Sequence, residues 1–158
     1  MQYAKVINTN WRPELHGEDK ELAVDVKIEI EVTPDILNQL CAEDEVPDYK
    51  KLFHDEKNMK LETGIESIKF NRKYDDHELA LSFSALFADE DQNTQYFKEV
   101  KIKSIVAAPL NGGLIKLTFT AQFMPIEKDI AMITESVLKP CYIGIIGPAQ
   151  IDFIEDGQ

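Results

Sequence analysis

The segment from Leu22 to Val32 alternates at every position between an apolar branched residue and either a charged residue or alanine. A period of two is that of a β-strand with one face in a core and the other in water. The pattern therefore predicts a long, half-buried strand and favours a fold built mainly from sheet.

Two further regions predict hairpins. Apolar residues recur over 68–70 and then, after the turn-like pair Asp75-Asp76, at the odd positions of 79–87. A second hairpin is expected where strands over 100–106 and 115–123 flank an Asn-Gly-Gly sequence, because these residues tolerate the positive φ angles of a tight turn.

Short helices are expected around these strands. Residues 33–41 begin with Thr-Pro-Asp, which supplies an N-cap candidate, a first-turn proline and an acid near the positive end of the helix dipole. Further helices are expected over 49–53 and 125–137, and a strand over 141–146. The expected class is α+β and mainly β, as one domain over 1–158: an antiparallel sheet, folded as a sandwich or half barrel, with two or three short helices packed on it.

Charge constrains the partners. The chain of 158 residues has 29 acidic and 17 basic residues and a formal net charge of −12. This charge disfavours binding to duplex nucleic acid. It favours a protein partner with a basic surface, and the acidic surface of this chain could imitate nucleic acid in front of a protein that binds it. Acidity that serves solubility alone is the other explanation. No apolar run approaches the roughly 20 residues of a membrane span and no signal peptide is evident, so we expect a cytoplasmic protein without membrane contact.

Cysteine and histidine are few and scattered. Cys41 and Cys141 lie far apart on apolar segments, and we expect both to be reduced. His16, His54 and His77 do not occur at metal-ligand spacing with each other or with the cysteines, so no metal site and no cofactor is expected. His77 lies among acidic residues in the predicted turn and is expected to be solvated.

Short pieces spread over much of the chain, of which Trp11 to Ile28 is the longest, resemble an uncharacterised family of accessory proteins encoded by tailed phages and prophages. The resemblance implies a phage origin, in an infected or lysogenic host, and it implies no catalytic residues because no activity is assigned to that family. The matching pieces are Trp11 to Ile28 with Gly17-Glu18-Asp19 inside it, Tyr49 to Phe53, Gly112-Gly113, the 117–123 strand and Pro125.

Two acidic clusters in predicted loops are the leading candidates for partner contact. Loop carboxylates can present charge without disturbing a core. We expect them to bind a protein partner, with a host defence factor or a nucleic-acid-handling factor as the candidates. The clusters are Glu43, Asp44 and Glu45, and Asp89, Glu90 and Asp91.

A basic cluster that includes one aromatic residue keeps a nucleic-acid function open. Lys69, Arg72, Lys73 and Tyr74 are typical of a single-stranded nucleic-acid-binding module that assists recombination or replication. Basic residues also protect a sheet edge from unwanted strand pairing, which is the alternative explanation.

Enzymatic function is not expected, because the chain lacks both a Gly-x-Ser-x-Gly turn and a phosphate-binding glycine loop. One alternative remains, a metal-dependent nuclease in which Glu99 and Lys101 act with an upstream acid, Asp89 or Asp91. The same Glu-x-Lys pattern is typical of the wet face of an antiparallel strand. A structural particle component and a homodimer formed through a strand edge are also open.

Overall fold

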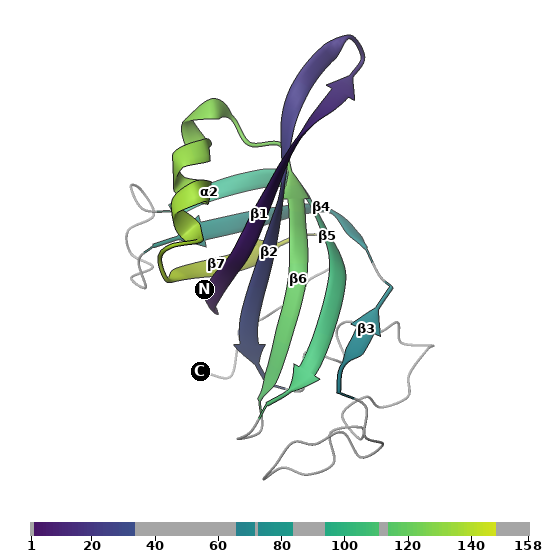
Figure 1. The fold of residues 1–158 in the computed structure, drawn as a ribbon, viewed down its shortest axis with the longest axis vertical. Helices are drawn as coiled ribbons and strands as arrows, with labels where there is room; N and C mark the ends of the chain where they lie inside the picture. Colours follow the sequence, from purple (N-terminus) through teal and green to yellow (C-terminus); the bar gives the residue numbers. More distant parts are fainter. Residues whose placement is uncertain (1, 34–65, 72, 84–93, 111–113, 148–158) are drawn as a thin grey trace.

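The computed structural model describes residues 2–33, 66–71, 73–83, 94–110 and 114–147. Within these residues the chain is mainly strand, with one short α-helix that follows a 3-10 turn (Figure 1). The strands are β1 (Gln2–His16), β2 (Asp19–Val32), β3 (Ile68–Phe70), β4 (Tyr74–Ser82), β5 (Thr94–Pro109), β6 (Ile115–Phe123) and β7 (Cys141–Ile146), and the helical elements are η2 (Glu127–Asp129) and α2 (Ile130–Ser136).

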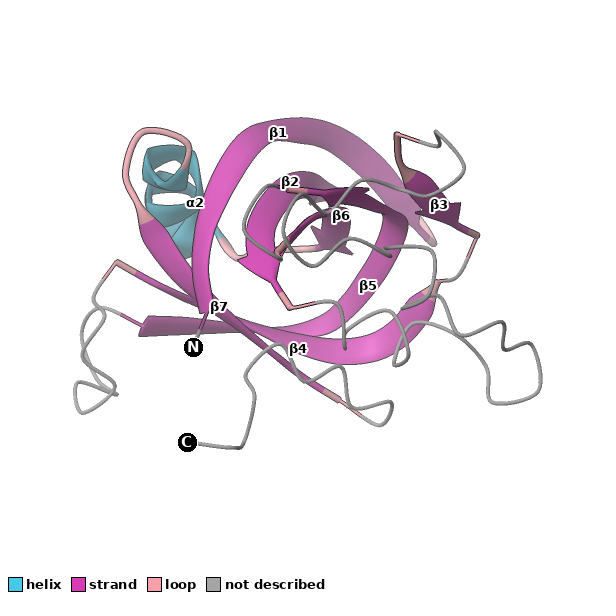
Figure 2. Cartoon of the chain, turned by 90° about the horizontal axis from the view of Figure 1, so that it is seen from below, coloured by secondary structure: helices cyan, strands magenta, loops and turns pink. Residues whose placement is uncertain are grey.

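Six strands close into an antiparallel barrel. The order around the ring is β5-β4-β7-β1-β2-β6, and β6 pairs back onto β5 (Figure 2). Strands β4, β5 and β6 are successive neighbours, and β7 returns beside β4, which is a Greek-key arrangement. The expected antiparallel, mainly β fold is confirmed, but the sheet closes completely because β6 pairs with β5, so it forms neither the expected sandwich nor a half barrel.

Strands β3 and β4 do not form the hairpin that the sequence predicts. They lie end to end along the same edge of β5, where Phe70 faces Ile105 and Tyr74 faces Ile102. The predicted turn at Asp75-Asp76 is wrong, because both residues lie within β4. Asp76 has a φ of 56° beside a register shift, and an aspartate at positive φ is common to bulges and turns alike.

Strand β5 changes the phase of its alternation twice. Each change coincides with a residue in the left-handed region, Glu99 and Ser104, both with a φ of 55°. Bulges of this kind increase the coiling of a strand, which lets one strand pair with different neighbours along its length. The buried positions of β5 are consequently Phe97, Val100, Ile102, Ile105 and Ala107.

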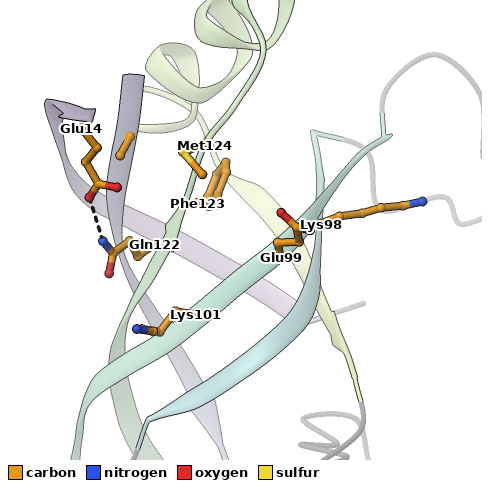
Figure 3. Close-up of a pocket in the computed structure, with 8 residues that line it drawn as sticks. Glu14, Lys98, Glu99, Lys101, Gln122, Phe123 and Met124 are labelled. Atoms are coloured by element: carbon orange, nitrogen blue, oxygen red, sulfur yellow. Dashed lines mark hydrogen bonds between the residues drawn. The ribbon is translucent and has the colours of Figure 1, made fainter. Parts of the chain in front are cut away.

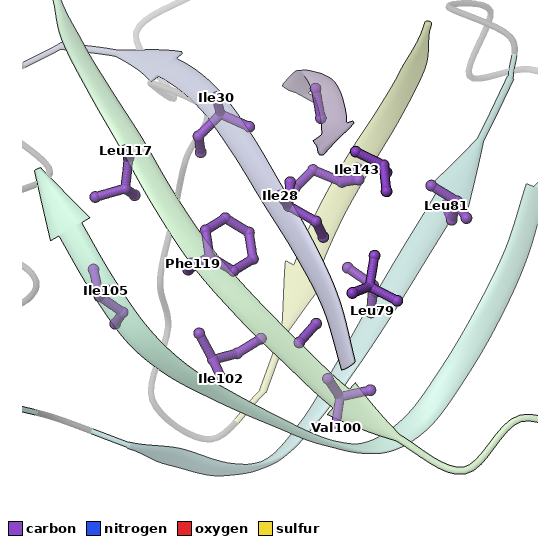
Figure 4. Close-up of a cluster of buried hydrophobic side chains, with 14 of the residues drawn as sticks. Ile28, Ile30, Leu79, Leu81, Val100, Ile102, Ile105, Leu117, Phe119 and Ile143 are labelled. Atoms are coloured by element: carbon purple, nitrogen blue, oxygen red, sulfur yellow. The ribbon is translucent and has the colours of Figure 1, made fainter. Parts of the chain in front are cut away.

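The barrel interior is filled by apolar side chains (Figure 4). Phe119 of β6 is 1% exposed, and the rings of Phe97 and Phe123 stack with their centroids 4.5 Å apart. A barrel of six strands has an interior wide enough for side chains only. A binding site is therefore expected on the outer surface.

Helix α2 lies outside the barrel, beside β1 (Figure 1). Ile133 is fully buried in the core cluster, whereas Ile126 and Val137, which also belong to the expected helix, are exposed. The expected helix over 125–137 is thus shorter, because the segment opens with an extended residue and a 3-10 turn. The helices expected over 33–41 and 49–53 lie outside the described residues. Among the described residues, no helix combines the length and apolar character that a membrane crossing requires.

His77 is buried, which corrects the expectation of a solvated histidine. The residue is 2% exposed, and its Nδ1 lies 2.7 Å from the carbonyl oxygen of Asp75. Tyr74 contacts the ring edge-on at 5.9 Å, and Gly147 lies against the ring from the end of β7. The position of His77 in β4 directs its side chain inward. The acidic residues on either side of it give no sign of this burial in the sequence.

Candidate protein-binding site

The hairpin of β1 and β2 projects beyond the barrel as a two-stranded ribbon (Figure 1). Strand β1 pairs with β7 only over residues 2–4, and β2 pairs with β6 only from Val24 onward, so among the described residues this projecting part pairs only with itself. Gly17 has a φ of 68° and allows the tight connection between His16 and Asp19. We call residues 12–23 the ribbon.

Charged side chains clamp the base of the ribbon. Arg12 donates from Nη1 to Asp25 and from Nε and Nη2 to Glu14 Oε1, at 3.1 and 2.9 Å for the two bonds to Glu14. Gln122 of β6 donates to the same Glu14 oxygen at 3.4 Å. The hydrogen bond from Arg12 lowers the pKa of Glu14 below its ordinary value of 4.5. The clamp therefore joins β1, β2 and β6 where the ribbon leaves the barrel.

One face of the ribbon is apolar except for Lys20, which lies opposite Leu15. The alternation that buries Val24 in the core continues along β2 to Leu22, which pairs with Pro13 of β1. Trp11 packs against the core, but Leu15 is 69% exposed and Leu22 is 39% exposed. The inward face of the sheet thus extends past the end of the barrel into solvent.

A notch lies beside the base of the ribbon, where β6 ends (Figure 3). Its volume is about 190 Å³. Ala23, Phe123 and Met124 supply apolar surface, while charged and amide groups surround them. The lining residues are Glu14, Ala23, Lys98, Glu99, Lys101, Gln122, Phe123 and Met124.

The two acidic clusters that the sequence favours, Glu43–Glu45 and Asp89–Asp91, lie outside the described residues. They remain expectations.

Of the proposed nucleic-acid cluster, Lys69 and Lys73 are exposed beside β5, and Arg72 lies outside the described residues. Tyr74 is half-buried, packs against the core and contacts His77, so it is poorly placed to stack on a base.

The proposed nuclease pair is brought to one place. Glu99 and Lys101 both line the notch, and Lys101 Nζ lies 3.6 Å from Asp75 Oδ1. Asp89 and Asp91, the predicted upstream acids, lie outside the described residues. Within the part of the chain that is described, no group of three or more His, Cys, Asp or Glu side chains could hold a metal ion.

The ribbon is the feature that sequence reasoning missed. Its signal is present, because the alternation of 22–32 begins at Leu22, but its exposure depends on where β6 ends. Comparisons with protein-family models, with curated proteins and with solved structures gave no match.

Proposed function

We propose that this chain is a non-enzymatic accessory protein that binds a protein partner through its ribbon. The observation that carries the proposal is the exposure of Leu15 and Leu22 on one face of a braced, projecting strand pair. Apolar surface left in water costs about 25 cal/mol per Å², and a partner that covers it recovers this free energy. A pre-ordered ribbon also loses little conformational entropy on binding.

The charges of the ribbon favour a partner with a basic surface. Its acids are Glu14, Glu18, Asp19 and Glu21, against the bases Arg12 and Lys20. The whole chain is also negatively charged, with a formal net charge of −12. Complementary charge accelerates encounter and selects the partner, while the apolar contact supplies affinity.

The notch supports the same function. Its apolar surface from Ala23, Phe123 and Met124 is surrounded by charged groups, which is the arrangement of a protein interface with a dry centre and a polar rim. A side chain of the partner fits this notch while the partner's backbone lies along the ribbon. The unpaired strand edges of the ribbon offer hydrogen bonds to an added strand.

The acidity and the resemblance to phage accessory proteins favour a more specific role. In this role the protein acts in the cytoplasm of an infected host. Its partner is a host defence factor or another nucleic-acid-handling protein, because such proteins carry basic surfaces.

The test is affinity capture with matched variants. The double variant Leu15→Ser, Leu22→Ser should lose the partner that the native chain retains from host extract. The control Leu138→Ser removes an equally apolar side chain that is 83% exposed after α2, and it should retain the partner. Equal retention by both variants, with unchanged thermal unfolding, would exclude the ribbon as the binding element.

A further inference from the structure

The outer face of the barrel carries lysines that form no close ion pair with the described residues. Lys27 of β2 and Lys103 of β5 both lie opposite Thr120 of β6, so they flank this threonine on the same face. Lys103 has a carboxylate only at 4.0 Å, and that carboxylate, Asp25, already accepts from Arg12. We call Lys27, Lys69, Lys73, Lys103 and Lys116 the lysine face.

The alternation of the strands directs the side chains of Lys27, Lys69, Lys103 and Lys116 outward, and Lys73 is exposed just before β4 begins. Lys116 lies between the buried residues Ile115 and Leu117, and Lys69 lies between Ile68 and Phe70, which pack on the core. Strands in a sheet are about 4.8 Å apart, so Lys27 and Lys103, two strands apart, are separated by roughly 10 Å at the backbone. Thr120 adds a hydroxyl donor between them.

The net charge of the whole chain does not describe this surface. The described residues contain 15 acids and 12 bases, whereas the segments outside them contain 14 acids and 5 bases. The described part is therefore close to neutral. The acids beside the lysine face include Asp25 and Asp75, which are paired with Arg12 and Lys101, and two glutamates of β2: Glu29, and Glu31, which lies opposite Lys116.

We propose that the lysine face binds the phosphate backbone of single-stranded nucleic acid, independently of the ribbon. Lysines bind phosphate by releasing counterions, and a flexible single strand can follow the curved outer surface of a small barrel. A stiff duplex would touch only part of that surface. No aromatic residue belongs to the lysine face, so binding should depend on salt and little on base sequence.

The probe is a fluorescein-labelled 30-mer of thymidine, titrated at 25 mM salt and upward. Contacts with about four phosphates predict a slope near −3 for log affinity against log salt, at about −0.7 for each contact. The double variant Lys27→Glu, Lys103→Glu should weaken binding at least tenfold.

The control Lys128→Glu, Lys139→Glu has the same net charge, with its changes on η2 and after α2, and it should weaken binding less than threefold. Three results would overturn the proposal: no binding by the native chain at 25 mM salt, equal losses in both double variants, or equal affinity for a duplex of the same length. Thermal unfolding of each variant shows that the fold is retained.

Discussion

Arg12 of β1 hydrogen-bonds to Asp25 of β2 diagonally across the strand pair, beside the point where β6 ends. The second oxygen of Asp25, Oδ1, is buried and has no hydrogen-bond partner among the described residues. Asp25 therefore depends on Arg12, since its other cation, Lys103, is 4.0 Å away. This pair, together with Glu14, links β1 to β2 at the base of the ribbon.

Replacing Arg12 by methionine should loosen the ribbon without unfolding the barrel. The variant leaves Glu14 and Asp25 without their shared cation, so the strands of the ribbon should separate more often. Amide hydrogen exchange by NMR should accelerate at least fivefold over residues 12–23 and stay unchanged in β6. Lys139→Met, which breaks an exposed pair with Glu135, is the control. Unchanged exchange in the ribbon would show that the clamp does not brace it.

A glycine substitution should keep the free energy of unfolding at the bulge residue Ser104 and lower it at the neighbouring Lys103. Ser104 has a φ of 55°, which costs a residue with a side chain about 1–2 kcal/mol and costs glycine almost nothing. Ser104→Gly should therefore be neutral or stabilise by up to about 1 kcal/mol, while Lys103→Gly, at an ordinary strand position, should lose about 1 kcal/mol. Urea unfolding measures both. Equal losses would mean that the bulge places no demand on the backbone at Ser104.

The contact between Gly147 and His77 predicts that the effects of substitutions at these two positions on the free energy of unfolding are strongly coupled. A Cβ at position 147 would lie 2.5 Å from Cδ2 of the His77 ring, so Gly147→Ala should cost about 1–3 kcal/mol of the free energy of unfolding. His77→Ala removes the obstacle, and in that background the added methyl group should cost much less. Additive losses in the double-mutant cycle would argue against this packing.

Burial of Cys141 predicts a loss of stability at alkaline pH. Desolvation raises the pKa of its thiol from 9.0 to about 11, so the folded chain keeps the proton where the unfolded chain releases it. Its contribution to stability is complete below pH 9 and is lost as the pH rises toward 11, on the order of 2 kcal/mol. Urea unfolding under reductant at pH 8 and pH 10.5 should show a smaller drop for Cys141→Ala. Equal drops would indicate that the thiol titrates normally.

The parts of the fold that can be predicted are those in which local pattern and final burial agree. The alternation from Leu22 to Val32 identifies β2, and the apolar patterns before and after residues 111–113 identify the hairpin of β5 and β6, because these signals are local. Strand β1 is not predicted, since its polar side chains and the register shift after Val6 interrupt the alternation. The bulges at Glu99 and Ser104 accompany closure of the barrel. Neither residue has a conformational preference for positive φ from which a bulge could be predicted.

The candidate site shows the same limit. Leu22 belongs to the predicted strand, but its exposure depends on the end of β6 at Phe123 and on the length of β1. The lysine face likewise depends on pairing between strands that are distant in sequence, because Lys27 and Lys103 become neighbours only when β2 and β5 pair with opposite edges of β6.

The most direct test of the ribbon as the binding element is site-specific photo-crosslinking in cells that make the protein. A benzophenone amino acid at position 15 should crosslink to one partner, and the same group at position 138 should not. The crosslinked product should be lost when Leu22→Ser is combined with the crosslinker at position 15. Crosslinking to the same partner from position 138, or none from position 15, would contradict binding through the ribbon.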